Sequence, residues 1–123
     1  MPTKNYFTPQ TDQNLFRCPC GQCSLRPKQE LIDRLNTARE LFGLPIHVTS
    51  GVRCPEYNST LPNAAADSGH TEGEAADVAC ITGQTRKRLA KALDLAGFKR
   101  IGFYKHHLHV DISDNKPESW WVG

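Results

Sequence analysis

The sequence lacks a long apolar run and a marked excess of charge of either sign. No stretch approaches the roughly 20 consecutive apolar residues that cross a bilayer, so we expect no contact with a membrane. The 15 basic residues against 13 acidic residues give a formal net charge of +2, a balance that does not favour nucleic acid as a partner. Residues 1–10 lack the apolar segment and cleavage site of a secretory signal, so we expect a protein made in the cytoplasm without a signal peptide.

The length of 123 residues suits a single domain. Hydrophobic residues make up 38% and charged residues 23% of the chain, which is the ordinary balance of a globular protein. We predict an irregular N-terminal arm with a cysteine cluster over residues 1–24 and one folded domain over residues 25–123. A domain of this size buries only a modest core, so a bound metal would add useful stability. We expect a monomer.

The spacing of apolar residues predicts an α+β fold. Leu31, Leu35, Ala38 and Phe42 recur every three or four residues, which places them on one face of a helix. The patterns together predict helices over 27–42 and 84–96, strands over 46–50, 75–81, 100–104 and 107–112, and a long loop over 51–69. We therefore expect a small, mainly antiparallel sheet with helices packed on one side. The tryptophans of the tail over residues 117–123 are expected to anchor the C-terminus by packing.

Histidines and acidic residues cluster in two segments of the chain. Three of the five histidines fall within four residues, at 106, 107 and 109, and one histidine alone would more often be structural. In the other segment, Gly69 and Gly73 permit a sharp reversal that could bring His70 and Asp77 to one point. Zinc accepts both side chains, and a catalytic site needs a third protein ligand and an open position. His109 can supply that third ligand from the neighbouring hairpin.

A guanidinium in the long loop is a candidate for binding substrate. Arg53 lies in the segment Ser50-Gly51-Val52-Arg53, at the start of that loop. Arginine binds a carboxylate through two parallel hydrogen bonds, which suits a substrate with a free carboxylate. A plain surface arginine is the alternative for this residue.

Three motifs in order resemble those of the zinc D-alanyl-D-alanine carboxypeptidase family. They are Ser50-Gly51-Val52-Arg53 with Asn58, then Ser68-Gly69-His70 with Gly73 and Ala76-Asp77, then His109-Val110-Asp111. The family includes phage endolysins that cut L-alanyl-D-glutamate bonds, and it shares its fold with the hedgehog signalling domain. The resemblance covers about residues 25–122. It implies the hedgehog/DD-peptidase fold and a catalytic Zn²⁺ held by His70, Asp77 and His109.

The same resemblance suggests roles for residues around the metal. It implies that Arg53 assists substrate binding or steadies charge in the transition state, and that Ser68 helps to position the substrate. Several relatives place an acidic general base three positions before the last histidine ligand, where this chain has His106. Other relatives use a histidine near that position, which is acceptable chemistry for a base.

The choice of general base stays open between two adjacent histidines. Strand alternation puts His107, His109 and Asp111 on one face and turns His106 away. His106 can still reach the metal if the strand begins only at His107, and we favour His106 on that ground, with His107 as the alternative. Asp111 is expected to orient a histidine rather than to bind the metal.

The resemblance points to a peptidoglycan peptidase as the function. We expect a zinc-dependent enzyme that hydrolyses stem peptides, of the D-Ala-D-Ala carboxypeptidase or endolysin type. A phage origin would suit it, with action on the cell wall after phage-assisted release or as a virion component. The alternative is a zinc-bearing, non-catalytic module that binds the cell wall or serves a structural role in a virion.

The cysteines allow three interpretations. Cys18, Cys20, Cys23 and Cys54 could hold a second, structural zinc, although a Cys-x-Cys spacing is unusual for that metal. A disulfide between Cys54 and one of the other three is the second possibility, and it needs an oxidising environment. Free thiols are the third. Cys80 falls in a predicted strand and is expected to be a core thiol.

Overall fold

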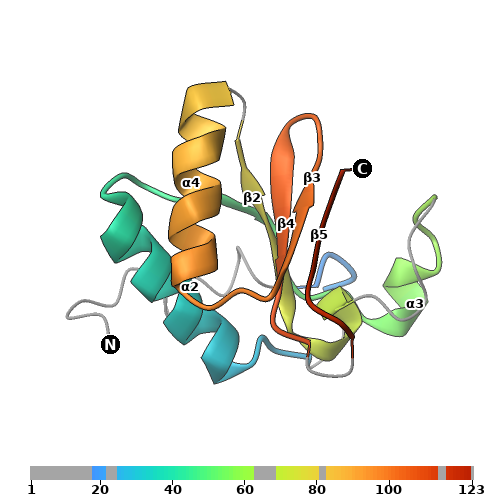
Figure 1. Ribbon diagram of the computed structural model, residues 1–123. Helices are drawn as coiled ribbons and strands as arrows, with labels where there is room; N and C mark the ends of the chain where they lie inside the picture. Colours follow the sequence, from blue (N-terminus) through green and yellow to red (C-terminus); the bar gives the residue numbers. More distant parts are fainter. Residues whose placement is uncertain (1–17, 22–24, 63–68, 81–82, 114–115, 123) are drawn as a thin grey trace.

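The fold is a single five-stranded sheet with two long helices on one face. The computed structural model describes residues 18–21, 25–62, 69–80, 83–113 and 116–122. Figure 1 shows α2 (Gln29–Phe42) and α4 (Gly83–Leu95) side by side against this face. The short helix α3 (Pro55–Asn58) lies on the far side of the sheet from α4 (Figure 1). The α+β architecture expected from the sequence is confirmed.

The strands are mainly antiparallel and follow the order β1-β2-β4-β3-β5. Their bounds are Val48–Ser50 for β1, Ala75–Ala79 for β2, Arg100–Phe103 for β3, His107–Asp111 for β4 and Ser119–Val122 for β5. The first four strands pair antiparallel with their neighbours, and β5 pairs parallel with β3. The two strands that hold the chemistry, β2 and β4, are therefore adjacent at the middle of the sheet.

The core lies between the sheet and the two long helices. Leu31 and Leu35 of α2 pack there with Leu89 and Leu93 of α4, and all four side chains are fully buried. The apolar stripe forms because residues three and four apart share one face of a helix. α2 ends at Gly43, whose φ of 79° is the left-handed conformation that glycine adopts at low cost.

Alternation along β2 and β4 separates the core from the site. Ala76 and Val78 of β2 pair with Val110 and Leu108 of β4, and these four side chains face the helices. The intervening residues must point to the opposite face, because successive side chains of a strand alternate. That face carries the polar residues of the histidine segments.

One row of residues crosses the whole sheet on this polar face. The strand register pairs Ser50 with Asp77, Asp77 with His109, His109 with Gly102, and Gly102 with Trp121. A side chain at Gly102 would be impossible without movement, since an added Cβ would lie 2.6 Å from the Trp121 ring. The glycine therefore lets the indole lie close to the centre of the sheet.

The C-terminal tail is more ordered than the sequence indicated. The tryptophans of residues 117–123 were predicted to anchor the C-terminus by packing, and Trp120 lies against Phe103 at a ring distance of 5.5 Å. The structure also adds β5 to the sheet edge, which was not predicted. The apolar segment of the tail is too short to predict a strand by its pattern, and the strand forms through its pairing with β3. Within the described residues, no helix combines the length and apolarity that crossing a bilayer would require.

Candidate metal centre and active site

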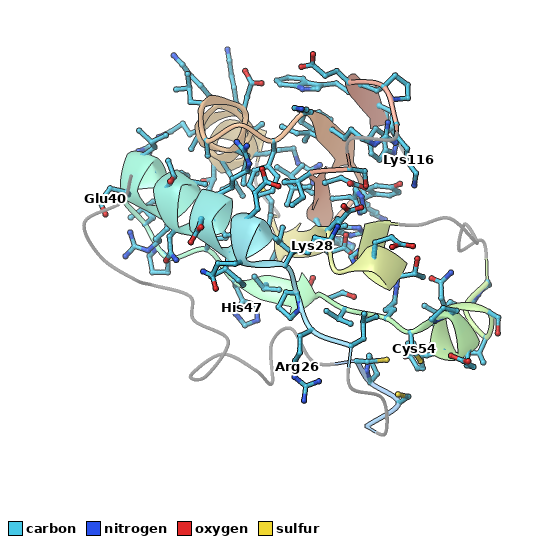
Figure 2. All side chains as sticks on the ribbon, turned by 90° about the horizontal axis from the view of Figure 1, so that it is seen from below. Arg26, Lys28, Glu40, His47, Cys54 and Lys116 are labelled. Carbon is cyan, nitrogen blue, oxygen red and sulfur yellow. The ribbon has the colours of Figure 1, made fainter. Side chains whose placement is uncertain are left out.

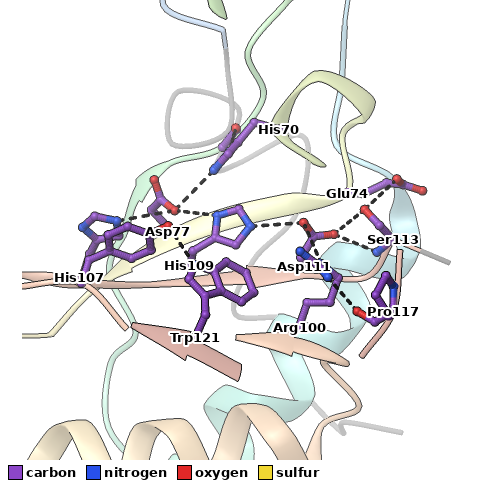
Figure 3. Close-up of polar contacts among 12 residues, drawn as sticks. His70, Glu74, Asp77, Arg100, His107, His109, Asp111, Ser113, Pro117 and Trp121 are labelled. Atoms are coloured by element: carbon purple, nitrogen blue, oxygen red, sulfur yellow. Dashed lines mark hydrogen bonds and ion pairs between the residues drawn. The ribbon is translucent and has the colours of Figure 1, made fainter. Parts of the chain in front are cut away.

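Three side chains from three different elements meet on the polar face of the sheet. His70 comes from the 3₁₀ turn η1 (Gly69–Glu72), Asp77 from β2 and His109 from β4. His70 Nε2 lies 3.3 Å and His109 Nδ1 lies 3.2 Å from the same oxygen, Asp77 Oδ1. One potential ligand atom from each residue lies within 4.8 Å of the other two. Figure 3 shows His70 and His109 both directed at Asp77.

The second nitrogen of each imidazole is held by an acceptor. His70 Nδ1 lies 2.5 Å from the carbonyl oxygen of Gly51, and His109 Nε2 lies 3.1 Å from Asp111 Oδ2. A carbonyl and a carboxylate can only accept, so these two nitrogens carry the protons. In the neutral imidazoles, His70 Nε2 and His109 Nδ1 are then lone-pair acceptors. Ligating histidines are oriented by the same kind of contact.

This donor set fits a metal ion. One nitrogen of each imidazole and the carboxylate of Asp77 converge on one point, where a metal ion can take the place of the proton that an imidazole would otherwise share with Asp77. Two histidines and one carboxylate form a known set of catalytic zinc ligands, which leaves a fourth position open. The described residues contain one further group of this kind, formed by Cys18, Cys20 and Cys54.

The electrostatics of the site keep both carboxylates charged. Burial alone would raise the pKa of Asp77, but its contacts with His109 and His70 hold that pKa well below its usual range. Burial also opposes ionisation of Asp111, while the contacts with His109 and Ser113 lower its pKa to about 2. Asp111 accepts hydrogen bonds from both the amide and the hydroxyl of Ser113. It therefore orients His109, as predicted, from a fixed position.

A sharp reversal connects the first ligand to the second. Gly73 has a φ of 69°, and an added Cβ would lie 2.5 Å from the carbonyl oxygen of Arg26. A residue with a side chain would be strained in that conformation and would also clash with the backbone. Glycine at this position lets η1 turn directly into β2, which brings His70 over Asp77.

A cleft of about 520 Å³ opens over the three side chains. Its lining residues are Arg53, Leu61, Pro62, Gly69, His70, Asp77, Arg100, Tyr104, His107, His109, Asp111, Lys116 and Trp121. Arg53, Arg100 and Lys116 carry a positive charge against the two carboxylates of Asp77 and Asp111, so with a divalent cation bound the cleft would favour an anionic group.

The sequence model of the family described as Peptidase M15 matches residues 6–113. The chain belongs to the peptidase M15 family. Membership implies a hydrolase of the zinc-dependent metallopeptidase type, and the convergence of His70, Asp77 and His109 provides a place for the metal. A comparison with curated proteins found no match.

The match to the M15 family covers more of the chain than the three motifs did. It begins at residue 6, within the predicted arm, and so includes the cysteines of that arm. It ends at residue 113, before β5.

The two candidate bases of this M15 peptidase lie in different surroundings. β4 begins at His107, whose Nε2 is 3.9 Å from Asp77 Oδ1, and His107 lines the cleft. His106 is exposed, is not among the cleft residues, and contributes its carbonyl oxygen to Cys80 N–H. The geometry therefore favours His107, the alternative that strand alternation indicated, over His106, which was favoured from its position in the family motif. Two further residues named from the sequence, Ser68 of the second motif and Cys23 of the cysteine cluster, lie outside the described residues.

Aromatic residues of the M15 cleft were missed by the sequence analysis. Tyr104 stacks on His107 with ring centroids 4.7 Å apart and an interplanar angle of 4°. Trp121 Nε1 donates a hydrogen bond to Tyr104 Oη at 3.0 Å, and the indole lies 5.6 Å from the His109 ring. The one local signal in the sequence for the position of Trp121 was Gly102, a glycine within the predicted strand over 100–104.

Removal of the metal should lower the thermal stability of the M15 chain. We expect a chelator to reduce the unfolding midpoint by on the order of 10 °C at neutral pH, since a ligand at a thousand times its Kd stabilises by about 4 kcal/mol. Burial disfavours a charged His109, but the contacts with Asp111 and Asp77 raise its pKa above 6.5. Calorimetry with and without added zinc measures the midpoints.

The stabilisation by zinc should also depend on pH. Zinc must displace the proton from His109, so its contribution is fully present above the raised pKa of that residue and weakens as the pH falls through it. Equal midpoints with and without zinc at pH 8 would contradict a metal site in this fold.

Proposed function

We propose that this M15 chain hydrolyses peptide bonds of bacterial peptidoglycan stem peptides in a zinc-dependent reaction. The observation that carries the proposal is the convergence of His70, Asp77 and His109 in a cleft that is also lined by Arg53, Arg100 and Lys116. Stem peptides end in free carboxylates, so a cationic cleft beside a metal suits them. The resemblance of the three sequence motifs to cell-wall carboxypeptidases and endolysins supports the same substrate class.

Arg53 is proposed to bind the substrate carboxylate or to steady the developing oxyanion. Its side chain is half-buried and lines the cleft. Its backbone N–H donates to the carbonyl oxygen of His70 at 3.0 Å, and the preceding Gly51 accepts from the ring of the same histidine. The loop that carries the guanidinium is therefore fixed to a proposed metal ligand on both sides of Val52. A side chain held in this way can bind one carboxylate with little loss of entropy.

His107 is proposed as the general base. Its Nε2 points to the same oxygen of Asp77 as the two ligand histidines, but from the larger distance of 3.9 Å. At that distance Nε2 is beyond hydrogen-bond range of Asp77, so it can accept a proton from an attacking water. The ring is held against Tyr104, and Trp121 holds Tyr104 in turn. A base in a fixed orientation accepts a proton efficiently when it lies within hydrogen-bond reach of the attacking water.

The residues divide the reaction between them. Zinc at this site would supply an acidified water and a polarised scissile carbonyl. His107 accepts the proton of the attacking water and returns it to the leaving amine. Arg53 holds the substrate so that its scissile carbonyl lies over the metal position. Asp111 keeps His109 in the orientation that the site needs.

The origin and place of action are proposed from the family resemblance. We propose a phage-derived lysis enzyme or virion component that reaches the cell wall with the help of other phage proteins. The support is the resemblance to phage endolysins. We also propose a monomeric enzyme with peptidoglycan as its macromolecular partner. Ser68, in the second motif, is proposed to assist in positioning the substrate.

Digestion of purified peptidoglycan tests the proposed function. We expect the zinc-loaded protein to release D-alanine or to create new amino groups, and the chelated protein to do neither until zinc is restored. Mass spectrometry of the soluble fragments shows whether a C-terminal D-alanine or an internal bond of the stem peptide has been cut. Cell walls from several bacterial classes should be used, because stem peptides differ between them. A zinc-loaded, folded protein that releases nothing from any of them would instead support a non-catalytic cell-wall or virion module.

A further inference from the structure

Three cysteine sulfurs come together at a second place, and none of the three cysteines is among the residues that line the cleft. Cys18 and Cys54 are buried and Cys20 is half-buried. The three Sγ atoms lie within 4.8 Å of one another, and those of Cys20 and Cys54 are 3.7 Å apart. Figure 2 shows Cys54 at the start of α3, on the side of the molecule away from α4. Segments 36 residues apart in the chain are thus joined by their thiols.

The separation of the sulfurs suits tetrahedral coordination. Zinc binds thiolate sulfur at about 2.3 Å, so two sulfurs of one tetrahedron are about 3.8 Å apart. The two sulfurs of a disulfide are about 2.05 Å apart, and the Sγ atoms of Cys20 and Cys54 are well beyond that distance. A disulfide would also use only two of the three thiols and leave the third beside it without a role.

The backbone supports a thiolate at one of these positions. The amide N–H of Cys54 donates to Cys18 Sγ at 3.2 Å. An N–H donor of this kind stabilises a thiolate more than a thiol, because a hydrogen bond to a charged acceptor is the stronger one. Gly21, one residue after Cys20, returns the chain with a φ of 71° and an N–H bond to the carbonyl oxygen of Cys18. A tight turn therefore presents Cys18 and Cys20 to the same point.

The cluster needs a cation to become fully ionised. Adjacent thiolates repel one another, so the thiols alone would stay protonated at neutral pH. A divalent cation reverses that balance, since a coordinating thiol loses its proton.

We propose that Cys18, Cys20 and Cys54 form a structural site for a thiophilic divalent cation, zinc being the best fit. Binding displaces the thiol protons into solvent, and no oxidation or reduction is involved. The site fastens the segment around Cys18 to the loop that carries Arg53, because Arg53 directly precedes Cys54. Val52 packs within the same cluster, with Leu25 against it. The metal would hold this loop at Cys54, while the hydrogen bonds of His70 to Gly51 and Arg53 hold it on the cleft side.

Metal content and spectroscopy of the wild-type protein test the site without any variant. Protein purified under reducing conditions should contain two zinc ions per chain. Replacement by cobalt should give the intense near-ultraviolet absorption of thiolate-to-metal charge transfer, which a site of histidine and carboxylate ligands cannot produce. One zinc per chain with no such absorption would overturn the proposal. Mass spectrometry gives a second test. A mass two units below that of the reduced protein, with no cysteine-bound metal, would show a disulfide and would also overturn the proposal.

Matched variants separate this site from the catalytic one. Cys20→Ser should lose one zinc per chain and the charge-transfer absorption, while His109→Ala should lose one zinc and keep that absorption. Cys80→Ala is the control, because Cys80 is a buried thiol of the main core, and it should keep both metals. Retention of two zinc ions by Cys20→Ser would count against the proposal. None of these readouts depends on peptidase activity, so the proposal stands or falls independently of the proposed function.

Discussion

In a His109→Ala variant we expect loss of the cleft metal and a fall in peptidase activity of roughly a thousandfold or more. The imidazole is one of the three proposed ligands, and its two nitrogens contact the carboxylates of Asp77 and Asp111. Its removal leaves two ligands, which is too few for a catalytic zinc site. The chemistry that the metal supplies is lost with the ion. Zinc analysis and peptidoglycan digestion measure the two effects on the same sample.

The matched control for this variant is His106→Ala. His106 lies three residues away in the sequence, but its side chain is exposed and outside the cleft. It should keep its metal and activity within about twofold, as surface substitutions usually do. The assignment of His109 as a ligand would be wrong if His109→Ala retained full zinc and activity. Circular dichroism of both variants checks that each is folded.

The second large effect is expected for His107→Ala. We expect kcat to fall by about 10²–10⁴-fold, the usual contribution of a positioned acid or base, while the zinc content stays at the wild-type level. His107 lies 3.9 Å from Asp77 Oδ1, compared with 3.2 Å for His109, so its loss removes a proton acceptor and leaves the ligands in place. Steady-state kinetics on a soluble stem-peptide fragment separates kcat from KM.

The pair His107→Ala and His106→Ala decides which histidine is the base. Loss of kcat in His106→Ala alone would overturn the proposal that His107 is the base and restore the interpretation based on the sequence pattern. Loss of zinc in His107→Ala would show that it binds metal. A further check is Tyr104→Phe, which removes the hydrogen bond from Trp121 but keeps the stacked ring. It should retain most of the activity if the stacking is what orients His107.

Much of the scaffold was predictable because its signals are local. The spacing of Leu31, Leu35 and Phe42 indicated a helix over 27–42, and α2 occupies Gln29–Phe42. The helix starts later than predicted because Lys28 keeps an extended backbone, with a ψ of 146°. Strands over 75–81 and 107–112 were expected, and β2 and β4 occupy most of these ranges.

The sequence by itself determined which chemistry the chain can perform. Histidine and aspartate are metal-binding residue types whatever the fold, so His70, Asp77 and His109 could be proposed as ligands from the motifs and the family resemblance alone. Only the tertiary structure decided which neighbours join them. The side that His107 faces depends on where β4 begins, and a shift by one residue would reverse it. The places of Trp121 and Cys18 depend on strand pairing and contacts between distant segments, which no local pattern of residues specifies.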